Sequence, residues 1–302
     1  MAHITIAASA KAFRVLFNLA EAGFTFKKND KGNFGPFSAS YNVKLHLSGG
    51  TIQLNDDNTL EIQNVDIVFD TLDFQLCLNL PGFCIGGFCI VPDPWNGCLV
   101  SFPGFCIGGP VCADLDLSGL VAQITDMKAN LLAKYIVDPA RPAGVTDVEA
   151  EIQNHPNKWK VFINPTYVNV IIDFPETLDN ILANAIQNAI NDLFPSWLPG
   201  WAKDLIWAFL GPIVDLIKGI IGIVGSIANW LENLLNNVFG LVPLIETAIA
   251  DYFASQNSIY EFNDPYPILG PSGILIPVMI PIRNLGATVN SKEMIVQADV
   301  GA

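Results

Sequence analysis

The sequence predicts an α+β fold in which a curved antiparallel sheet wraps around long amphipathic helices, giving an elongated molecule. Three observations lead to this fold class. Apolar and polar residues alternate along residues 41–80, paired apolar residues recur at helical spacing along residues 213–239, and alternation returns after Ile259. Strands followed by long helices and then by further strands are typical of an α+β domain.

A single domain is expected over residues 1–302. Residues 1–174 are predicted to be mainly β, with a cysteine-rich insert at residues 77–112. Residues 175–254 are predicted to be helical, and residues 255–302 to form closing strands. Because the closing strands need the N-terminal sheet as a neighbour, one continuous domain is favoured over two.

Composition narrows the function classes. Of 302 residues, 51% are apolar and 15% are charged, which excludes a disordered chain. The formal net charge is −14, and there is no basic cluster beyond Lys27 and Lys28. No nucleic-acid partner is therefore expected, and any contact with a membrane would have to be hydrophobic.

The N-terminal segment predicts a short strand followed by an amphipathic helix, and it lacks the features of a secretory signal. Because the cysteine-rich insert suggests disulfides, we nevertheless expect an extracellular protein, or one released without a recognisable signal peptide. A cytoplasmic location is the alternative.

Residues 41–80 predict an antiparallel meander with turns at residues 48–50 and 55–58. The apolar phase slips by one residue between Phe69 and Leu72, which predicts a bulge or a strongly bent strand.

The cysteine-rich insert contains a repeat, "PGFCIGGFC" at residues 81–89 and "PGFCIGGPVC" at residues 103–112. A two-residue turn at the glycines of the first copy would place two cysteines on facing strands, and a three-residue turn does the same in the second copy. The predicted disulfides are Cys84–Cys89, Cys106–Cys112 and, for the remaining pair, Cys77–Cys98. A zinc site built from paired cysteines and free buried thiols are the alternatives. Disulfides would imply an oxidising compartment.

Helices and strands alternate after the insert. Residues 117–137 predict an amphipathic helix, and residues 159–174 a pair of strands. Residues 175–194 predict a helix whose first turn contains Pro175, a favourable start. Residues 213–239 predict a second long helix of about 40 Å.

Prolines shape the end of the chain. Pro243 is expected to kink or end the second long helix, and a last helical piece ends near Phe253. Residues 274–285 contain two prolines and predict an edge strand, and residues 286–300 predict a closing hairpin.

A bilayer-spanning role for the second long helix is not favoured. A spanning helix needs about 20 consecutive apolar residues. The longest uncharged run here, between Lys218 and Glu232, has 13 residues.

Enzyme signals are weak, so we expect no catalytic activity, no cofactor and no metal. The histidines are His3, His46 and His155, and none belongs to a hydrolase or zinc motif. "DLDLSG" at residues 114–119 imitates the first half of a calcium loop, but Thr125 stands where the bidentate glutamate should be.

The element order carries a resemblance. A bent meander, a strand that runs directly into a long amphipathic helix ("VNVIIDFPETLDNILANAIQNAINDLF"), a second long apolar helix and closing strands resemble the tubular lipid-binding superfamily, which includes the bactericidal/permeability-increasing proteins. The resemblance implies a sheet rolled around a long helix, with acyl chains held in the tunnel between them.

The predicted function is therefore the binding of a lipid or another hydrophobic small molecule in an internal apolar groove. The apolar stripe of the second long helix is about 160° wide, more than one sheet face can cover. The expected lining residues are Ile217, Ile220, Val224, Ile227 and Leu231 on the helix, and Phe74, Leu76 and Leu78 on the sheet. The alternatives are a membrane-active or toxin-associated protein in which residues 195–253 swing out, with transient membrane contact, and a structural subunit that binds a protein partner.

Overall fold

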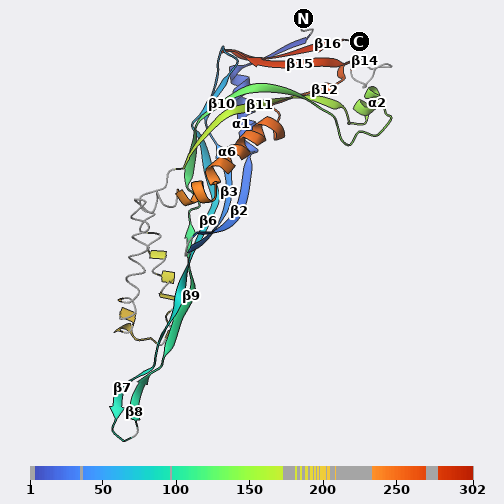
Figure 1. Ribbon diagram of the computed structural model, residues 1–302. Coiled ribbons are helices and arrows are strands. Elements are labelled where there is room, and N and C mark those ends of the chain that lie inside the picture. Colours follow the sequence, from blue (N-terminus) through green and yellow to red (C-terminus); the bar gives the residue numbers. More distant parts are fainter. Residues whose placement is uncertain are drawn as a thin grey trace.

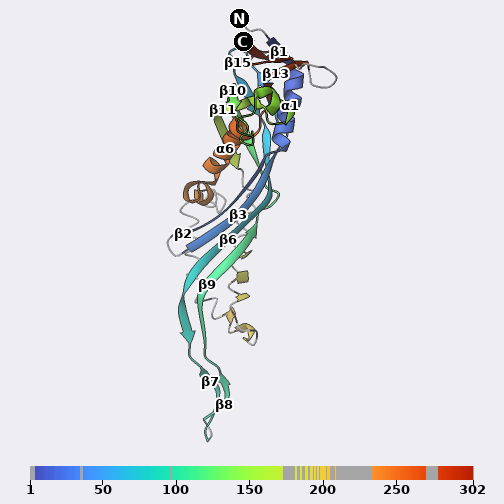
Figure 2. The same cartoon turned by 90° about the vertical axis from the view of Figure 1, so that its right-hand side faces the viewer.

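The computed structural model describes residues 4–34, 37–95, 97–172, 233–269 and 278–301, together with scattered residues between 181 and 208. The molecule is long and bent (Figure 1), and the two chain ends lie together at its wide end. A narrow β ribbon extends from the wide part to the opposite end. It is formed by residues within 73–116, and we call it the blade. Figure 2 shows the same taper from the side.

The predicted fold class is wrong. The described chain is mainly β, with large antiparallel sheets, and its sheets do not wrap around long amphipathic helices. The longest helices with continuous description are α1, Ala10–Ala22, with 13 residues and α6, Leu241–Asp251, with 11. Among the described residues a long strand, β10, replaces the helix predicted over residues 117–137, because cross-strand pairing extends further along the chain than local residue preferences indicate.

The largest sheet in the described residues contains nine antiparallel strands. Their bounds are β2 Thr25–Phe34, β3 Phe37–Ser48, β4 Thr51–Leu54, β5 Leu60–Gln63, β6 Val65–Ile85, β9 Phe105–Asp116, β10 Val121–Ile136, β11 Asn157–Ile172 and β12 Tyr260–Asp264. The main path runs β12-β11-β10-β6-β3-β2, with β9 paired to β6 and the short β4–β5 hairpin paired to β10. The strands and turns predicted within residues 41–80 are confirmed as β3 to β6, but the predicted meander is wrong, because β3 pairs with β6 and the β4–β5 hairpin between them pairs with β10.

A second sheet joins the two ends of the chain. Its strands are β1 Ile4–Ser9, β15 Ile282–Val289 and β16 Glu293–Val300, in the order β1-β16-β15. The β15–β16 pair confirms the predicted closing hairpin. The remaining strand pairs are β7 Phe88–Asp93 with β8 Gly97–Phe102, and β13 Tyr266–Leu269 with β14 Val278–Ile280.

Short helices cover the core at the wide end. Besides α1 and α6 they are α2 Asp147–Ile152 and two π-helical turns, η1 Leu234–Val238 and η2 Tyr252–Gln256. The strand and helix predicted at the N-terminus are confirmed as β1 and α1, and the hydroxyl of Ser9 caps α1 by accepting from the Ala12 N–H at 3.3 Å. The Phe17 ring of α1 stacks on the Phe253 ring of η2, with centroids 5.8 Å apart. Gly240, in the left-handed conformation, separates η1 from α6, so the break lies three residues before Pro243.

The predicted bulge between Phe69 and Leu72 is confirmed. Leu45 of β3 faces Phe69 and Lys44 faces Thr71, so Asp70 has no partner in the ladder. Phe69 and Leu72 are both fully buried as a result. The extra residue puts the Asp70 carboxylate on the outer face, where Lys44 lies 3.0 Å from it.

Two predictions between residues 117 and 174 are wrong. The predicted helix over residues 117–137 is the strand β10, whose alternate residues Ala122, Ile124, Met127, Ala129 and Leu131 are buried. Helix-forming residue types are overridden because β11 pairs with this strand along nearly its whole length. The predicted strand pair over residues 159–174 is the single strand β11, with a bulge at Thr166 just after Pro165.

Glu21, near the end of α1, is a charged residue inside the core. Its side chain is 4% exposed, and its Oε1 atom has no hydrogen-bond partner among the described residues. Burial raises the pKa of the Glu21 carboxyl from 4.5 to about 7, and the nearby Asp66 carboxylate contributes to the increase. The folded protein therefore binds a proton at Glu21 more tightly than the unfolded chain does.

We predict that the free energy of unfolding falls as the pH rises from about 4.5 to about 7, because over that interval the unfolded chain releases the Glu21 proton while the folded state still holds it. Glu21→Gln should be more stable than the parent protein at pH 8, by about 2 kcal/mol, and close to it at pH 5. Urea denaturation at both pH values measures this difference. Glu61→Gln, in β5, is the control, and an equal gain in that variant would contradict the assignment to Glu21.

Candidate functional site

The blade is built by strands that continue beyond the core. β6 and β9 stay paired from Asp73–Asp116 to Ile85–Phe105, and β7 and β8 extend the ribbon to its tip. Between residues 74 and 113 Asp93 is the only charged residue. Charge pairing therefore contributes little to the structure of the blade.

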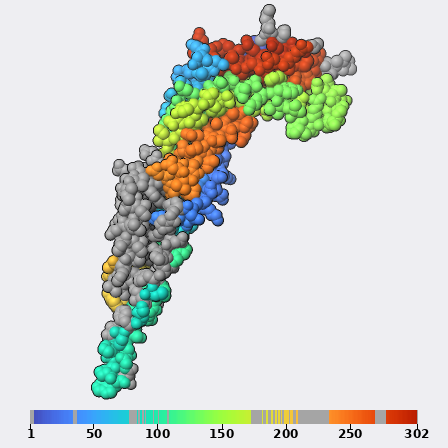
Figure 3. All heavy atoms as spheres, in the orientation of Figure 1, coloured from blue at the N-terminus to red at the C-terminus, as the bar shows by residue number. Residues whose placement is uncertain are grey.

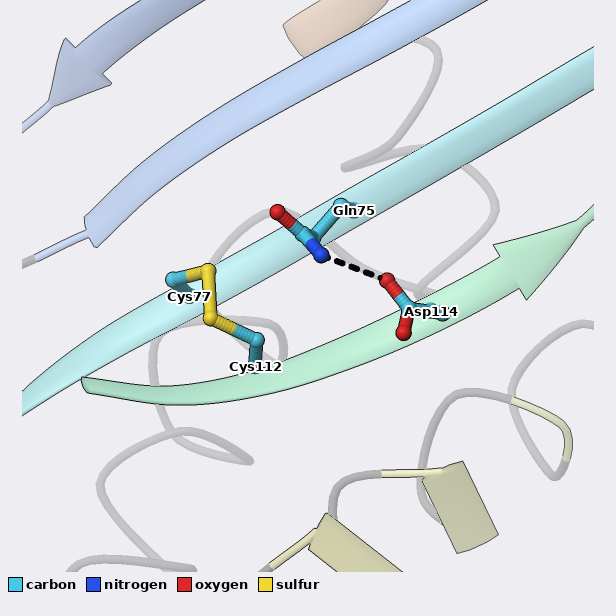
Figure 4. Close-up of a disulfide and its surroundings, with 4 residues drawn as sticks. All are labelled: Gln75, Cys77, Cys112 and Asp114. Atoms are coloured by element: carbon cyan, nitrogen blue, oxygen red, sulfur yellow. Dashed lines mark hydrogen bonds between the residues drawn. A yellow bond between two sulfur atoms is a disulfide. The ribbon is translucent and has the colours of Figure 1, made fainter.

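Three disulfides connect the two sides of the blade. They are Cys77–Cys112, Cys84–Cys106 and Cys89–Cys98, with sequence separations of 35, 22 and 9 residues. Each bond encloses the next, as rungs do along one long hairpin. Figure 4 shows the first rung beside a hydrogen bond of 2.7 Å from the Gln75 amide to the Asp114 carboxylate, which links the same two strands.

All three predicted pairings are wrong, although the prediction of three disulfides is confirmed. The prediction placed a separate turn at each glycine pair, as in Cys84–Cys89 and Cys106–Cys112, with Cys77–Cys98 left over. The structure instead makes one long hairpin, and the midpoints of the three observed pairs all fall between residues 93 and 95. Nested midpoints are the signal in the sequence that identifies this arrangement.

The oxidation state of the cysteines bears on the two alternative roles predicted for them and on the compartment in which the protein folds. No described cysteine is free, so neither the zinc site nor the free thiols occur. Three disulfides indicate that the protein folds in an oxidising environment. No helix among the described residues is long and apolar enough to cross a membrane.

The sequence-predicted ligand-binding residues fall into two groups. Phe74 and Leu76 lie on the same face of β6 and are 1% and 4% exposed. The side chain of Leu78 is not described, but its backbone faces Val111 of β9. The five helix residues, Ile217, Ile220, Val224, Ile227 and Leu231, lie outside the described residues, as does most of the predicted helix over residues 213–239.

The apolar face of Phe74 and Leu76 extends into the blade. Its described side chains are buried, and they are Phe37, Ala39, Tyr41, Phe74, Leu76, Val111, Ala113 and Leu115. The Phe239 ring contacts Tyr41 at the core end, and the Trp201 ring contacts Phe102 further towards the tip, at centroid distances of 5.0 and 5.8 Å. The buried layer therefore continues beyond the compact core.

Residue size varies along this face. Ala39, Leu76 and Ala113 are opposite one another on β3, β6 and β9. The next row towards the core is Tyr41, Phe74 and Leu115, in which every side chain is large. Alanines stand on either side of Leu76 where the neighbouring row has larger side chains, and we call this row of three residues the alanine furrow.

A groove of about 860 Å³ crosses β2, β3, β6 and β9. Its exposed side chains are polar, and they are Asn29, Asp30, Lys31, Asn42, Asp73, Gln75, Asp114 and Asp116. Several of them pair with one another, as in the hydrogen bond of 3.4 Å from the Asn42 amide to Asp73. The groove is also lined by Tyr41, Phe74 and Leu115, so it combines polar side chains with part of the predicted apolar face.

Two of the histidines lie beside aspartates. His46 lies 2.8 Å from Asp70, and His155 lies 3.2 Å from Asp138. The pKa of Asp70 lies below its ordinary value, chiefly because Lys44 donates a hydrogen bond to it, with a smaller effect from His46. No group of three metal-binding side chains occurs in the part of the chain that the structure describes.

The calcium-loop residues have other roles. Asp116 accepts a hydrogen bond of 2.9 Å from the Ser118 N–H, and the Ser118 hydroxyl accepts one of 3.2 Å from Leu72. Thr125 lies on β10 and accepts from the Asn169 amide at 2.7 Å. The Asp116 and Ser118 oxygens stabilise the chain bend between β9 and β10, whereas the Thr125 hydroxyl links β10 to β11.

The turn at the end of the blade was missed by the sequence reasoning. Trp95 lies in this turn between β7 and β8, and Gly97 follows it with φ of +93°, a conformation that favours glycine. The sequence Pro94-Trp95-Asn96-Gly97, which contains an Asn-Gly dipeptide, is the signal that could have located this turn. Trp95 is the most exposed of the large apolar side chains described.

No protein-family model matches the chain, and no curated protein matches it at a significant level. The resemblance to the tubular lipid-binding superfamily therefore stays a prediction. Function has to be argued from the chemistry of the described surfaces.

We predict that the first and last rungs differ in their effect on stability. Replacing Cys77 and Cys112 together by serine should lower the free energy of unfolding by about 2–4 kcal/mol, because this bond closes the longest loop beside the core sheet. Replacing Cys89 and Cys98 should change global unfolding by less than about 1 kcal/mol, since that bond closes a short loop at the far end. Thermal unfolding of both double variants measures this, and equal losses would contradict it.

Proposed function

We propose that the chain is an extracellular, non-catalytic protein that binds a lipid or another hydrophobic small molecule along the apolar face of the blade. The observation that carries this proposal is the alanine furrow formed by Ala39, Leu76 and Ala113. Phe74 and Leu76, two of the ligand-binding residues predicted from sequence, lie at this place on the sheet.

The chemistry of the furrow favours an apolar ligand. Sites for hydrophobic molecules are lined mainly by apolar side chains, with few polar groups. The three furrow residues are 3–4% exposed, and the rows on either side also consist of apolar residue types. A strip of small apolar side chains between larger ones suits an extended hydrocarbon chain better than a compact polar ligand.

The extracellular location is supported by the disulfides. Bonded cysteines persist in oxidising compartments and are rare in the cytosol. A structural subunit is the rival function, in which the furrow would be filled by closely packed protein.

We predict that Ala113→Leu separates these two functions. If a ligand occupies the furrow, the added side chain should reduce binding of a fluorescent fatty acid severalfold while costing less than about 1 kcal/mol of stability. If the furrow is filled by protein, the same change should cost about 1–3 kcal/mol through overpacking. Fluorescence titration and urea denaturation measure the two quantities.

The matched control is Ala129→Leu. Ala129 is 1% exposed, as deeply buried as Ala113, but lies on β10 in the main core. This variant should lose stability and keep its affinity for the fatty acid. Organic extraction of the natively purified protein, followed by mass spectrometry, should recover a lipid. Absence of both an extracted lipid and fatty-acid binding would reject the proposal.

A further inference from the structure

The end of the blade carries exposed apolar side chains. Trp95 is 88% exposed, Leu99 68% and Val91 43%. They come from the turn and from both strands of the β7–β8 hairpin, and we call them the tip cluster. Figure 3 shows this end of the molecule projecting away from the wide end. Burying large side chains is the usual outcome of folding, so three exposed ones on a single hairpin require a reason.

The tip cluster is held in place before it meets any partner. The Cys89–Cys98 disulfide closes the hairpin, and the Trp95 N–H donates a hydrogen bond of 3.0 Å to the Asp93 carboxylate. Because the hairpin is already ordered, a partner does not have to supply the free energy of ordering it.

Charged residues are almost absent from the ribbon's own sequence. No lysine or arginine occurs between residues 45 and 127, and Asp93 is the only charged residue between 74 and 113. The blade therefore has no basic group to bind an anionic lipid headgroup. It also offers few side chains for the hydrogen bonds that protein interfaces make at about one per 100–200 Å².

We propose that the tip cluster inserts into the interfacial region of an electrically neutral, zwitterionic bilayer such as phosphatidylcholine. Tryptophan prefers this region because its ring is apolar and its N–H can still meet water. Val91 and Leu99 lie four residues from Trp95, about 10 Å along the hairpin, which matches the depth of interfacial contacts.

The backbone limits how deeply the tip enters. An isolated two-stranded hairpin has unpaired N–H and C=O groups along its outer edges, and hydrocarbon cannot satisfy them. The tip therefore stops where water still reaches these edges. This contact does not depend on the alanine furrow, so the two proposals can fail separately.

The test is the binding of the full chain to phosphatidylcholine vesicles in a flotation assay. Replacing Trp95 and Leu99 together by serine should lower the partition coefficient at least about tenfold, since two large apolar side chains no longer leave water. Fatty-acid binding at the furrow should stay unchanged in this variant. Tryptophan quenching by phosphatidylcholine brominated on its acyl chains should decrease in Trp95→Phe.

Leu19→Ser is the matched control. Leu19 is also 68% exposed, but lies on α1 at the wide end. Its replacement should leave vesicle binding unchanged. The proposal is overturned if the parent protein does not bind the vesicles, or if Leu19→Ser weakens binding as much as the tip variant does. Tighter binding to vesicles containing phosphatidylglycerol, reversed by salt, would also overturn it, because that result indicates electrostatic attraction.

Discussion

The hydrogen bonding of one strand, β6, organises the whole molecule. β6 pairs with β3 on one side, and on the other side its partner changes from β10 to β9. The change occurs at the Asp70 bulge, where the Leu117 N–H donates to the Leu72 carbonyl and the Phe69 N–H donates to the Leu120 carbonyl, at 2.8 and 3.2 Å. Bulges bend a strand and increase its twist, so the same residue that keeps Phe69 and Leu72 buried also sets the direction in which the blade leaves the core.

Beyond that point the means of stabilisation change. A two-stranded ribbon cannot bury enough apolar surface to be stable alone. The wide end depends on a core of phenylalanine, leucine and isoleucine side chains that includes Phe13, Phe69 and Phe253. The blade depends on its cysteines, which restrict the unfolded chain and keep the two strands together where few side chains can pack between them. Cross-links of this kind allow the ribbon to extend far from the core and to expose apolar residues at its end.

The sequence predicted the secondary structure best where one face of a strand is buried and the other is exposed to solvent. Alternation located the strands β3 and β6, and the phase slip located the bulge at Asp70. It failed for β10, because that strand contains many helix-forming residue types and is held by its long pairing with β11. It failed for the cysteines because each glycine pair was interpreted as a local turn, whereas the pairing is set by the distant turn at Trp95. Alternation predicted that Phe74 and Leu76 share one buried face of β6, but the alanines beside Leu76 depend on the register between strands, which a single sequence does not supply.

The distribution of charge gives the two ends of the molecule different capacities for association. The acidic excess behind the net charge of −14 lies almost wholly outside residues 74–113, so the remainder of one molecule repels that of another. The blade is nearly neutral and is not protected by such repulsion. Long strands with free edges tend to pair with other chains unless charges, prolines or a covering element prevent it. Here Pro92, Pro103 and Pro110 lie in or beside the blade strands and remove backbone donors from its edges, so strand addition is disfavoured along its length. The exposed side chains of the turn remain available for association at the far end. Contact through the turn leaves both the core and the buried apolar face undisturbed.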